Sequence, residues 1–122
     1  MTQTVLLIED NEQNRYLATF LLEKHGFRVV AAPDGSSGIE LAKTLTPDLI
    51  LLDIQLPLID GYTVARTLRN LQALRQTPII AVTSYAMPGD REKSIAAGCN
   101  GYIEKPINPD TFVEEINHYL LA

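Results

Sequence analysis

The sequence predicts a doubly wound α/β fold, in which five parallel strands form one sheet with helices on both faces. Five short apolar runs alternate along the chain with stretches that repeat apolar residues at helical spacing. Most of these runs are continuously hydrophobic, as expected of parallel strands that are buried on both faces. The connections are short, so right-handed crossovers favour a (βα)5 arrangement with strand order 2-1-3-4-5.

Length and composition indicate one soluble domain, residues 1–122, because 122 residues with 46% hydrophobic content can form a single core. The net charge of -5, without a basic run, makes direct binding to nucleic acid or to a membrane surface unexpected. The single cysteine, Cys99, cannot form an internal disulfide, and neither a signal peptide nor a membrane-spanning run is present. We therefore expect a cytoplasmic protein.

The predicted strands are the five apolar runs, at residues 4–8, 28–31, 49–52, 78–82 and 101–103. The first predicted helix begins in a polar segment, residues 11–14, and ends at Gly26. Helical spacing places a group of its side chains on one face, namely Leu17, Phe20, Leu21 and Lys24. The second helix covers residues 36–45 and ends before Pro47.

Three further helices are predicted after the third, fourth and fifth strands. The third opens after Asp60, a suitable N-cap, and the fourth begins near residues 88–90 and closes at Gly98. The last begins at Pro109, since proline is favoured in a first helical turn. The apolar stripes of the third and last helices comprise Val64, Leu68 and Leu71, and Phe112, Ile116, Tyr119 and Leu120, respectively.

Charged and hydroxyl side chains follow the strands, where ligands bind in such a sheet. Glu9 and Asp10 follow the first strand and Asp53 the third, while Thr83 and Lys105 follow the fourth and fifth. Crowded carboxylates repel one another, so a proton or a cation must lie among them, and a divalent ion is favoured at neutral pH. Because all the ligands are oxygens, Mg2+ or Mn2+ is expected rather than zinc.

This combination is typical of phosphoryl transfer to a carboxylate. Asp53 is the expected nucleophile, because it ends the central strand and aspartyl phosphate is an established covalent intermediate. Lys105 and Thr83 would contact the phosphoryl oxygens, and Glu9 and Asp10 would serve the metal.

Four segments that follow strands in this order carry a family resemblance. They are Glu9-Asp10-Asn11, Asp53-Ile54-Gln55-Leu56-Pro57 with Asp60-Gly61, Ala81-Val82-Thr83-Ser84, and Tyr102-Ile103-Glu104-Lys105-Pro106-Ile107. Together they resemble the motifs of response regulator receiver domains, which have the CheY-like form of the flavodoxin-like fold, and the similarity covers essentially the whole chain. With the further segment at residues 86–90, the chain is most similar to stand-alone receivers of the DivK type and to receivers of hybrid histidine kinases.

The resemblance implies a single-domain response regulator of a two-component phosphorelay. Asp53 would accept a phosphoryl group from a phosphohistidine on a histidine kinase or a histidine phosphotransfer protein. Mg2+ would be bound by Asp10, by the Asp53 carboxylate and by the backbone carbonyl of Gln55, while Glu9 would act through an ordered water. Glu9 lies where many family members have Asp. The domain would catalyse only its own phosphorylation and dephosphorylation, and it would turn over no external substrate.

The resemblance also implies a conformational switch. Thr83 would move toward the phosphoryl group and draw Tyr102 inward, which changes the face formed by the fourth helix, fifth strand and fifth helix. That face would bind a downstream protein, with the chain as a monomer or a phosphorylation-dependent dimer. The peptide bond before Pro106 is expected to be cis. Two side chains near the site, Gln55 and Tyr85, would tune the lifetime of the phosphoryl group, so we expect Tyr85→Ala to change the dephosphorylation rate without abolishing phosphorylation.

Four alternatives to a stand-alone receiver make different demands on the sequence. An FMN-binding flavodoxin-like protein should have a Gly/Ser/Thr-rich phosphate loop, whereas residues 9–11 would repel a phosphate. A haloacid-dehalogenase-type phosphatase should have a second Asp where Gln55 stands. A degenerate receiver that acts without phosphorylation is disfavoured, because the full set of Asp10, Asp53, Thr83 and Lys105 is present. The remaining alternative is a receiver excised from a hybrid histidine kinase.

Overall fold

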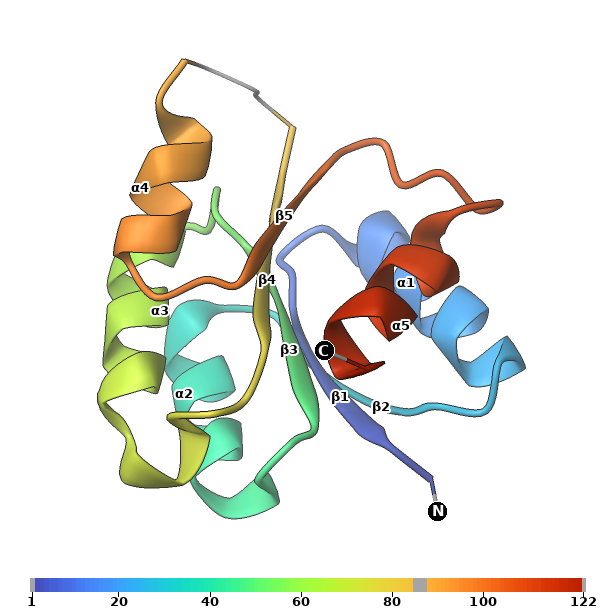
Figure 1. The fold of residues 1–122 in the computed structure, drawn as a ribbon, viewed down its shortest axis with the longest axis horizontal. Coiled ribbons are helices and arrows are strands. Elements are labelled where there is room, and N and C mark those ends of the chain that lie inside the picture. Colours follow the sequence, from blue (N-terminus) through green and yellow to red (C-terminus); the bar gives the residue numbers. More distant parts are fainter. Residues whose placement is uncertain (1, 85–87, 122) are drawn as a thin grey trace.

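The computed structural model describes residues 2–84 and 88–121, which form the predicted parallel sheet. The strand order is β2-β1-β3-β4-β5. The strands are β1 (Thr4–Ile8), β2 (Arg28–Ala32), β3 (Leu49–Asp53), β4 (Ile79–Thr83) and β5 (Gly101–Glu104). The helices are α1 (Glu12–Lys24), α2 (Gly35–Leu45), α3 (Gly61–Asn70), α4 (Asp90–Ala96) and α5 (Phe112–Leu121). Figure 1 shows α2, α3 and α4 on one face of the sheet, and α1 and α5 on the other.

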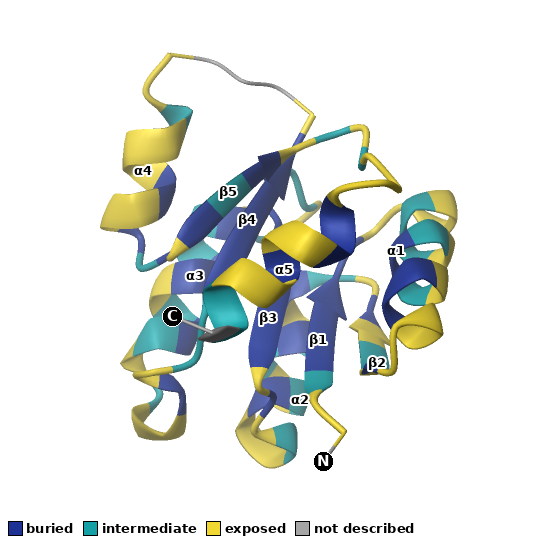
Figure 2. Cartoon of the chain, turned by 45° about the vertical axis from the view of Figure 1, so that its right-hand side comes forward, coloured by how far each residue is buried: buried dark blue, intermediate teal, exposed yellow. Residues whose placement is uncertain are grey.

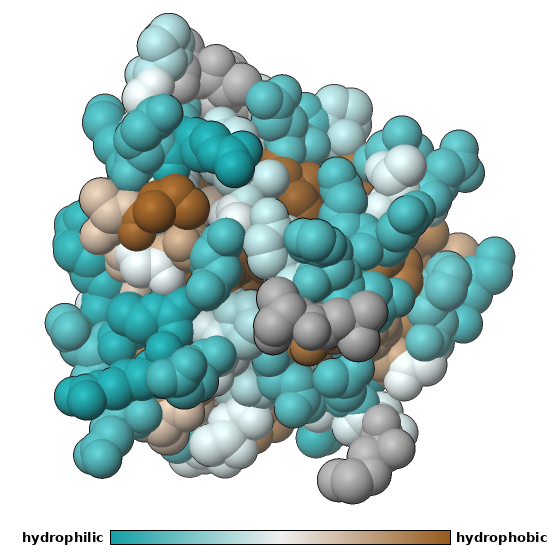
Figure 3. Space-filling model, in the orientation of Figure 1, coloured by the Kyte–Doolittle hydropathy of each residue, from teal (hydrophilic) through white to brown (hydrophobic). Residues whose placement is uncertain are grey.

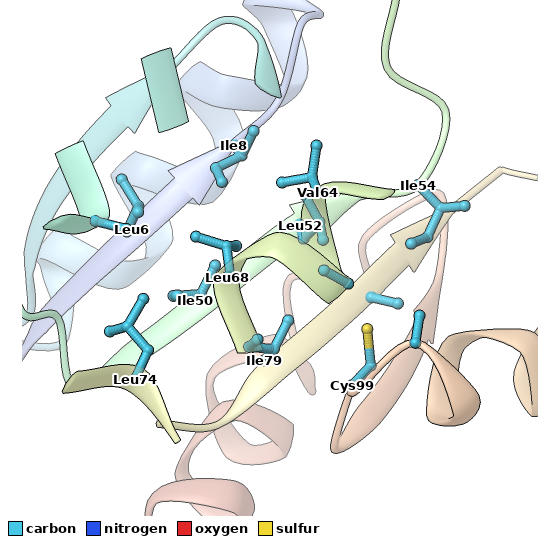
Figure 4. Packing of buried hydrophobic residues seen from close by; sticks show 14 of the residues in the cluster. Leu6, Ile8, Ile50, Leu52, Ile54, Val64, Leu68, Leu74, Ile79 and Cys99 are labelled. Atoms are coloured by element: carbon cyan, nitrogen blue, oxygen red, sulfur yellow. The ribbon is translucent and has the colours of Figure 1, made fainter. Parts of the chain in front are cut away.

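Each face of the sheet has its own hydrophobic core, and alternate residues of a strand contribute to different cores. In β1, Leu6 and Ile8 pack toward α2 and α3, whereas Val5 and Leu7 pack toward α1 and α5. Figure 4 shows the first of these clusters, with residues of β1, β3 and β4 facing Val64 and Leu68 of α3. All of β3 and β4 is buried (Figure 2), which explains why their sequences are continuously apolar.

The predicted boundaries agree with the structure to within one residue for the strands, but two local features differ. A short 3-10 helix, Gln72–Leu74, was not predicted. The last helix begins at Phe112, so the start predicted at Pro109 is wrong. The reason is a turn around Asn108, whose side-chain oxygen accepts a hydrogen bond from the Asp110 N–H at 2.9 Å and whose carbonyl accepts from Phe112 at 2.9 Å.

The prediction for the apolar face of α1 is wrong at Phe20. This side chain is 52% exposed and stacks on Tyr16, one turn earlier, with ring centroids 6.4 Å apart. The buried residues of the helix are Ala18, Leu21 and Leu22. The surface seen in Figure 3 is mostly hydrophilic, with a small hydrophobic patch over α4. Among the described residues, no helix is both long and apolar enough to span a membrane.

Candidate functional site

The register of the central strands brings the predicted site residues together at one edge of the sheet. Ile8 of β1 pairs with Leu52 of β3, so Glu9 emerges beside Asp53. On the other side of β3, Asp53 pairs with Val82, and the next residue of β4 is the buried Thr83. These chain segments end at the same level because the strands are parallel, as the sequence pattern predicts.

Three carboxylates form a cluster at this edge. Glu9, Asp10 and Asp53 each offer a carboxylate oxygen, and these oxygens lie within 4.8 Å of one another. The side chains of Glu9 and Asp53 are buried, while Asp10 is exposed to solvent. A set of hard oxygen donors with one solvent-facing member suits Mg2+, which binds one or two carboxylates and retains several waters. The residues present therefore fit a magnesium site.

The Lys105 ammonium lies between two of these carboxylates. Its Nζ is 2.7 Å from Glu9 Oε1 and 3.1 Å from Asp53 Oδ2. Burial alone would lower the pKa of Lys105, but the hydrogen bond to Glu9 and the charges of Asp53 and Glu9 outweigh it and raise the pKa. Lys105 therefore carries a full positive charge in the site at neutral pH.

The surroundings of Glu9 change the pKa of its carboxyl group. Burial is the main cause, and the neighbouring Asp53 adds to it, so that the pKa of Glu9 rises to about 7 although Lys105 and the Asn11 N–H oppose the rise. Glu9 Oε2 accepts a hydrogen bond from the Asn11 backbone N–H at 3.2 Å. Glu9 thus changes its charge near neutral pH.

Gln55 contacts the Asp53 carboxylate through its backbone and connects the neighbouring loops through its side chain. Asp53 Oδ1 accepts a hydrogen bond from the Gln55 N–H at 2.8 Å. The side-chain oxygen of Gln55 accepts from the Ser84 N–H at 3.0 Å and so bridges the loops that follow β3 and β4. The sequence predicts Gln55 near the site but not this bridge, because the bridge depends on the conformation of the side chain.

A further contact at the site was not predicted from the sequence. Nη1 of Arg15, on α1, donates to the backbone carbonyls of Glu9 at 2.9 Å and Asp10 at 3.0 Å. The only signal in the sequence is spacing, since a long cationic side chain in the first turns of a helix can reach back over the preceding loop.

The structure places the other predicted residues as follows. Tyr102 of β5 is half-buried and packs against the core cluster on the side of α3. The peptide bond between Lys105 and Pro106 is cis, as expected. Tyr85 lies outside the described residues. The roles assigned to these residues stay predictions.

Comparison with known proteins identifies the family. The sequence model of the response regulator receiver domain matches residues 5–117. The chain belongs to the response regulator receiver domain family. As a receiver domain it is a component of two-component signalling, and this assignment sets aside the FMN-binding and phosphatase alternatives.

The relatives include both stand-alone regulators and kinase receivers. The receiver domain is 43% identical over 120 residues to the polar-differentiation response regulator DivK of Brucella ovis, covering 98% of each chain. Among solved structures, it resembles chemotaxis response regulator CheY4 of Vibrio cholerae, with a TM-score of 0.93, 25% identity and coverage of 98% and 99% of the two chains.

A third relative is informative about the acidic cluster. The receiver domain of sensor histidine kinase PA1611 from Pseudomonas aeruginosa has a TM-score of 0.92 and 34% identity, with all of both chains covered, and it has a magnesium ion coordinated in its active-site cleft. Receiver domains bind Mg2+ at an acidic pocket, and they interact with histidine kinases or phosphotransfer proteins and with downstream targets. The cluster of Glu9, Asp10 and Asp53 is compatible with this property of the family.

Proposed function

We propose that Asp53 is the phosphoacceptor of a single-domain response regulator comprising residues 1–122. A carboxylate oxygen of Asp53 forms a bond to phosphorus while the P–N bond of a donor phosphohistidine breaks, and the imidazole nitrogen retains the electron pair. The observation that supports this role is the environment of Asp53: it is buried at the end of the central strand and is contacted by the Lys105 ammonium at 3.1 Å.

The neighbouring residues have separate roles in this proposal. Asp10, Asp53 and the Gln55 carbonyl would bind Mg2+, with Glu9 acting through a water. These residues would thereby hold positive charge next to the phosphoryl oxygens, which is the chemistry that the metal would supply. Lys105 supplies a second positive charge, and it is already directed at Asp53. Mn2+ could replace Mg2+, since it also prefers oxygen ligands.

The same proposal includes the switch and its output. Thr83 is buried at the end of β4, next to the Asp53 strand, where its hydroxyl would bond the phosphoryl group and favour an inward Tyr102. The changed face, formed by α4, β5 and α5, would bind the downstream protein. The test is the change in amide chemical shifts of α4 and β5 on phosphorylation. We expect Thr83→Ala to lose this change and Thr83→Ser to keep it. A change in Thr83→Ala equal to that of the parent protein would exclude the coupling.

The comparisons favour a stand-alone regulator over a receiver of a hybrid kinase. The match to DivK covers 98% of both chains, so the relative also has the size of one receiver domain. The donor is then a separate histidine kinase or phosphotransfer protein. Phosphotransfer assays with the kinases of the source organism would identify the donor.

The direct test is labelling by acetyl phosphate in Mg2+ buffer, followed by mass spectrometry of the intact chain. We expect the parent protein to gain one phosphoryl group, with acetate as the leaving group, and Asp53→Asn to gain none. Asp48→Asn is a matched control, since Asp48 is exposed before β3, where its carboxylate accepts from the Thr4 N–H at the other end of the sheet. Labelling of folded Asp53→Asn at another residue would refute the assignment.

A further inference from the structure

Arg15 makes an unusual contact with the loop that carries two of the three clustered acids. A single nitrogen of its guanidinium group, Nη1, donates hydrogen bonds to two consecutive backbone carbonyls, those of Glu9 at 2.9 Å and Asp10 at 3.0 Å. Hydrogen bonds from a charged donor are stronger than those between neutral groups. Arg15 is thus attached to the backbone that presents the carboxylates, and not to the carboxylates themselves.

The two carbonyls mark a change of backbone direction. In an extended strand, successive side chains point to opposite faces, so the carboxylates of Glu9 and Asp10 would lie on different sides of the sheet. Strand β1 ends at Ile8, the chain bends at Asp10, and oxygens of both carboxylates lie within 4.8 Å of each other and of Asp53. The acidic cluster therefore depends on this bend, and Arg15 contacts the backbone on both sides of it.

Arg15 itself has a fixed position because α1 is well anchored. Asn11 caps the helix by accepting a hydrogen bond from the Asn14 N–H at 2.9 Å, and the Asn11 carbonyl accepts from the Arg15 N–H at 2.9 Å. Farther along the helix, Leu21 and Leu22 are buried in the core. Arg15 therefore holds the loop between β1 and α1 in a defined place relative to the helix.

We propose that Arg15 is a positioning residue for the magnesium site, which holds the backbone of Glu9 and Asp10 so that their carboxylates point toward Asp53. The inference rests on the metal site of the proposed function. Arg15 contacts neither the carboxylates nor the acceptor oxygen; it acts through the two carbonyls. Groups that orient metal ligands in this way commonly change metal affinity by about 10- to 100-fold when they are removed.

The test is the Mg2+ affinity of the purified domain, measured by calorimetry and by amide chemical shifts during a titration with MgCl2. We expect Arg15→Met to weaken Mg2+ binding by about tenfold. Arg15→Lys should bind within about twofold of the parent, because a lysine Nζ can donate to the same two carbonyls and retains the charge. Arg28→Met is the matched control, since it removes one positive charge at the exposed start of β2.

Electrostatics alone predicts the opposite result, which makes the test decisive. Loss of a positive charge close to three carboxylates would strengthen the binding of a cation. Weaker binding by Arg15→Met therefore supports positioning, while unchanged or tighter binding overturns it. If Arg15→Met does not fold, Arg15→Gln is subject to the same criterion, because its side chain retains a donor but is too short to reach both carbonyls.

A metal-free measurement separates this inference from the proposed function. Without Mg2+, hydrogen exchange at the Asn11 N–H, which is bonded to Glu9, should accelerate in Arg15→Met and remain at the parental rate in Arg28→Met. If the parent protein does not bind Mg2+, the proposed metal site fails, and the inference fails with it. If the parent binds Mg2+ and Arg15→Met matches it in affinity and exchange, only the role of Arg15 is refuted.

Discussion

The Lys105 ammonium is closer to Glu9, at 2.7 Å, than to Asp53, at 3.1 Å. The side chain that would contact a phosphoryl group on Asp53 is therefore shared with a second carboxylate. A glutamate at position 9 is one methylene longer than the aspartate found there in many receiver domains. Because Glu9 is buried and close to Asp53, its charge changes with pH near neutrality, and with it the charge around Lys105.

The first prediction concerns stability without Mg2+. Burial, reinforced by Asp53, raises the pKa of Glu9 to about 7 from the ordinary value of 4.5, so the folded state binds more protons than the unfolded state between these values. The contribution of Glu9 to the stability of the folded state is therefore complete below about pH 4.5 and is lost as the pH rises through 7. We expect the free energy of unfolding to fall between pH 5 and 8 by at most about 3 kcal/mol.

Urea titrations of the metal-free protein at these pH values measure the effect. Glu9→Gln should remove most of the fall, because the amide does not titrate. Glu12→Gln, an exposed change nearby in α1, should leave it intact. If the free energy of unfolding depends on pH equally in Glu9→Gln and in the parent, groups other than Glu9 cause the dependence.

The second prediction compares two glycines that begin helices after an aspartate N-cap. A Cβ on Gly61 would collide with the backbone at the end of β3, namely Ile54 Cα and the Asp53 carbonyl oxygen, the latter at 2.8 Å. A Cβ on Gly35 would meet a side-chain methyl of Val64 at 2.7 Å, and displacing one buried side chain costs less than displacing backbone. We expect Gly61→Ala to cost about 3 kcal/mol and Gly35→Ala about 1 kcal/mol.

Chemical denaturation of the two variants gives these values. Because the collision at Gly61 involves the carbonyl of Asp53, Gly61→Ala should also slow labelling by acetyl phosphate, and Gly35→Ala should not. A smaller loss of stability for Gly61→Ala than for Gly35→Ala would mean that the end of β3 moves more easily than the Val64 side chain.

The third prediction concerns Arg69 at the end of α3. Its guanidinium donates to four backbone carbonyls and to the Asn100 side chain, so it connects α3 with the chain segments that precede β4 and β5; the carbonyls belong to Gly98, Leu74, Arg75 and Thr77. Arg69→Met removes a charged donor from all of these acceptors. The Leu74 carbonyl and the Asn100 side-chain oxygen each keep a second donor, the N–H groups of Thr77 and Ile79, respectively. We expect the substitution to cost about 3 kcal/mol, measured by thermal or chemical denaturation.

Arg66 provides the comparison, because it lies on the same helix and donates a hydrogen bond to Thr63 at 3.3 Å while remaining exposed. Arg66→Met loses the same charge and should change the stability by less than about 0.5 kcal/mol. Similar losses for the two variants would show that the effect comes from the charge and not from the bonds to the carbonyls.

Much of this architecture could be predicted from the sequence because it depends on periodicity. The continuous apolar character of β3 and β4 follows from burial on both faces, and the parallel arrangement then places Glu9, Asp53 and Lys105 at one edge. Such a prediction needs no knowledge of side-chain conformations. The strand order, the cis bond before Pro106 and the acidic cluster were all expected and found.

The features that were missed depend on side-chain conformation and on packing. Arg15 and Arg69 are ordinary helical cations in the sequence. Their bonds to carbonyls depend on where the folded chain places the acceptors, in the loop just before α1 for Arg15 and in the segments before β4 and β5 for Arg69. Phe20 fits the apolar spacing of α1, yet the turn of the helix toward the core buries Ala18 and Leu22 in its stead. In each case, tertiary packing decided among options that local patterns left open.

The last prediction concerns the bridge between Gln55 and Ser84. The Gln55 side-chain oxygen accepts from the Ser84 N–H at 3.0 Å, while the Gln55 N–H donates to Asp53 at 2.8 Å. One residue thus contacts both the phosphoacceptor and the loop that follows Thr83. Gln55→Leu keeps the backbone bond and removes the bridge, so we expect hydrogen exchange at the Ser84 N–H to accelerate about fivefold, as for the loss of a bond of about 1 kcal/mol.

Amide exchange followed by NMR gives this rate. Gln76→Leu is the control, because Gln76 is exposed between the 3-10 helix and β4, whereas Ser84 follows the other end of that strand. Since the bridge joins the loops on either side of Asp53, the decay rate of the acyl phosphate should also change in Gln55→Leu and stay constant in Gln76→Leu. An altered decay rate with unchanged Ser84 exchange would place the effect of Gln55 at the phosphoryl group alone. Unchanged values of both would remove Gln55 from the control of phosphoryl lifetime.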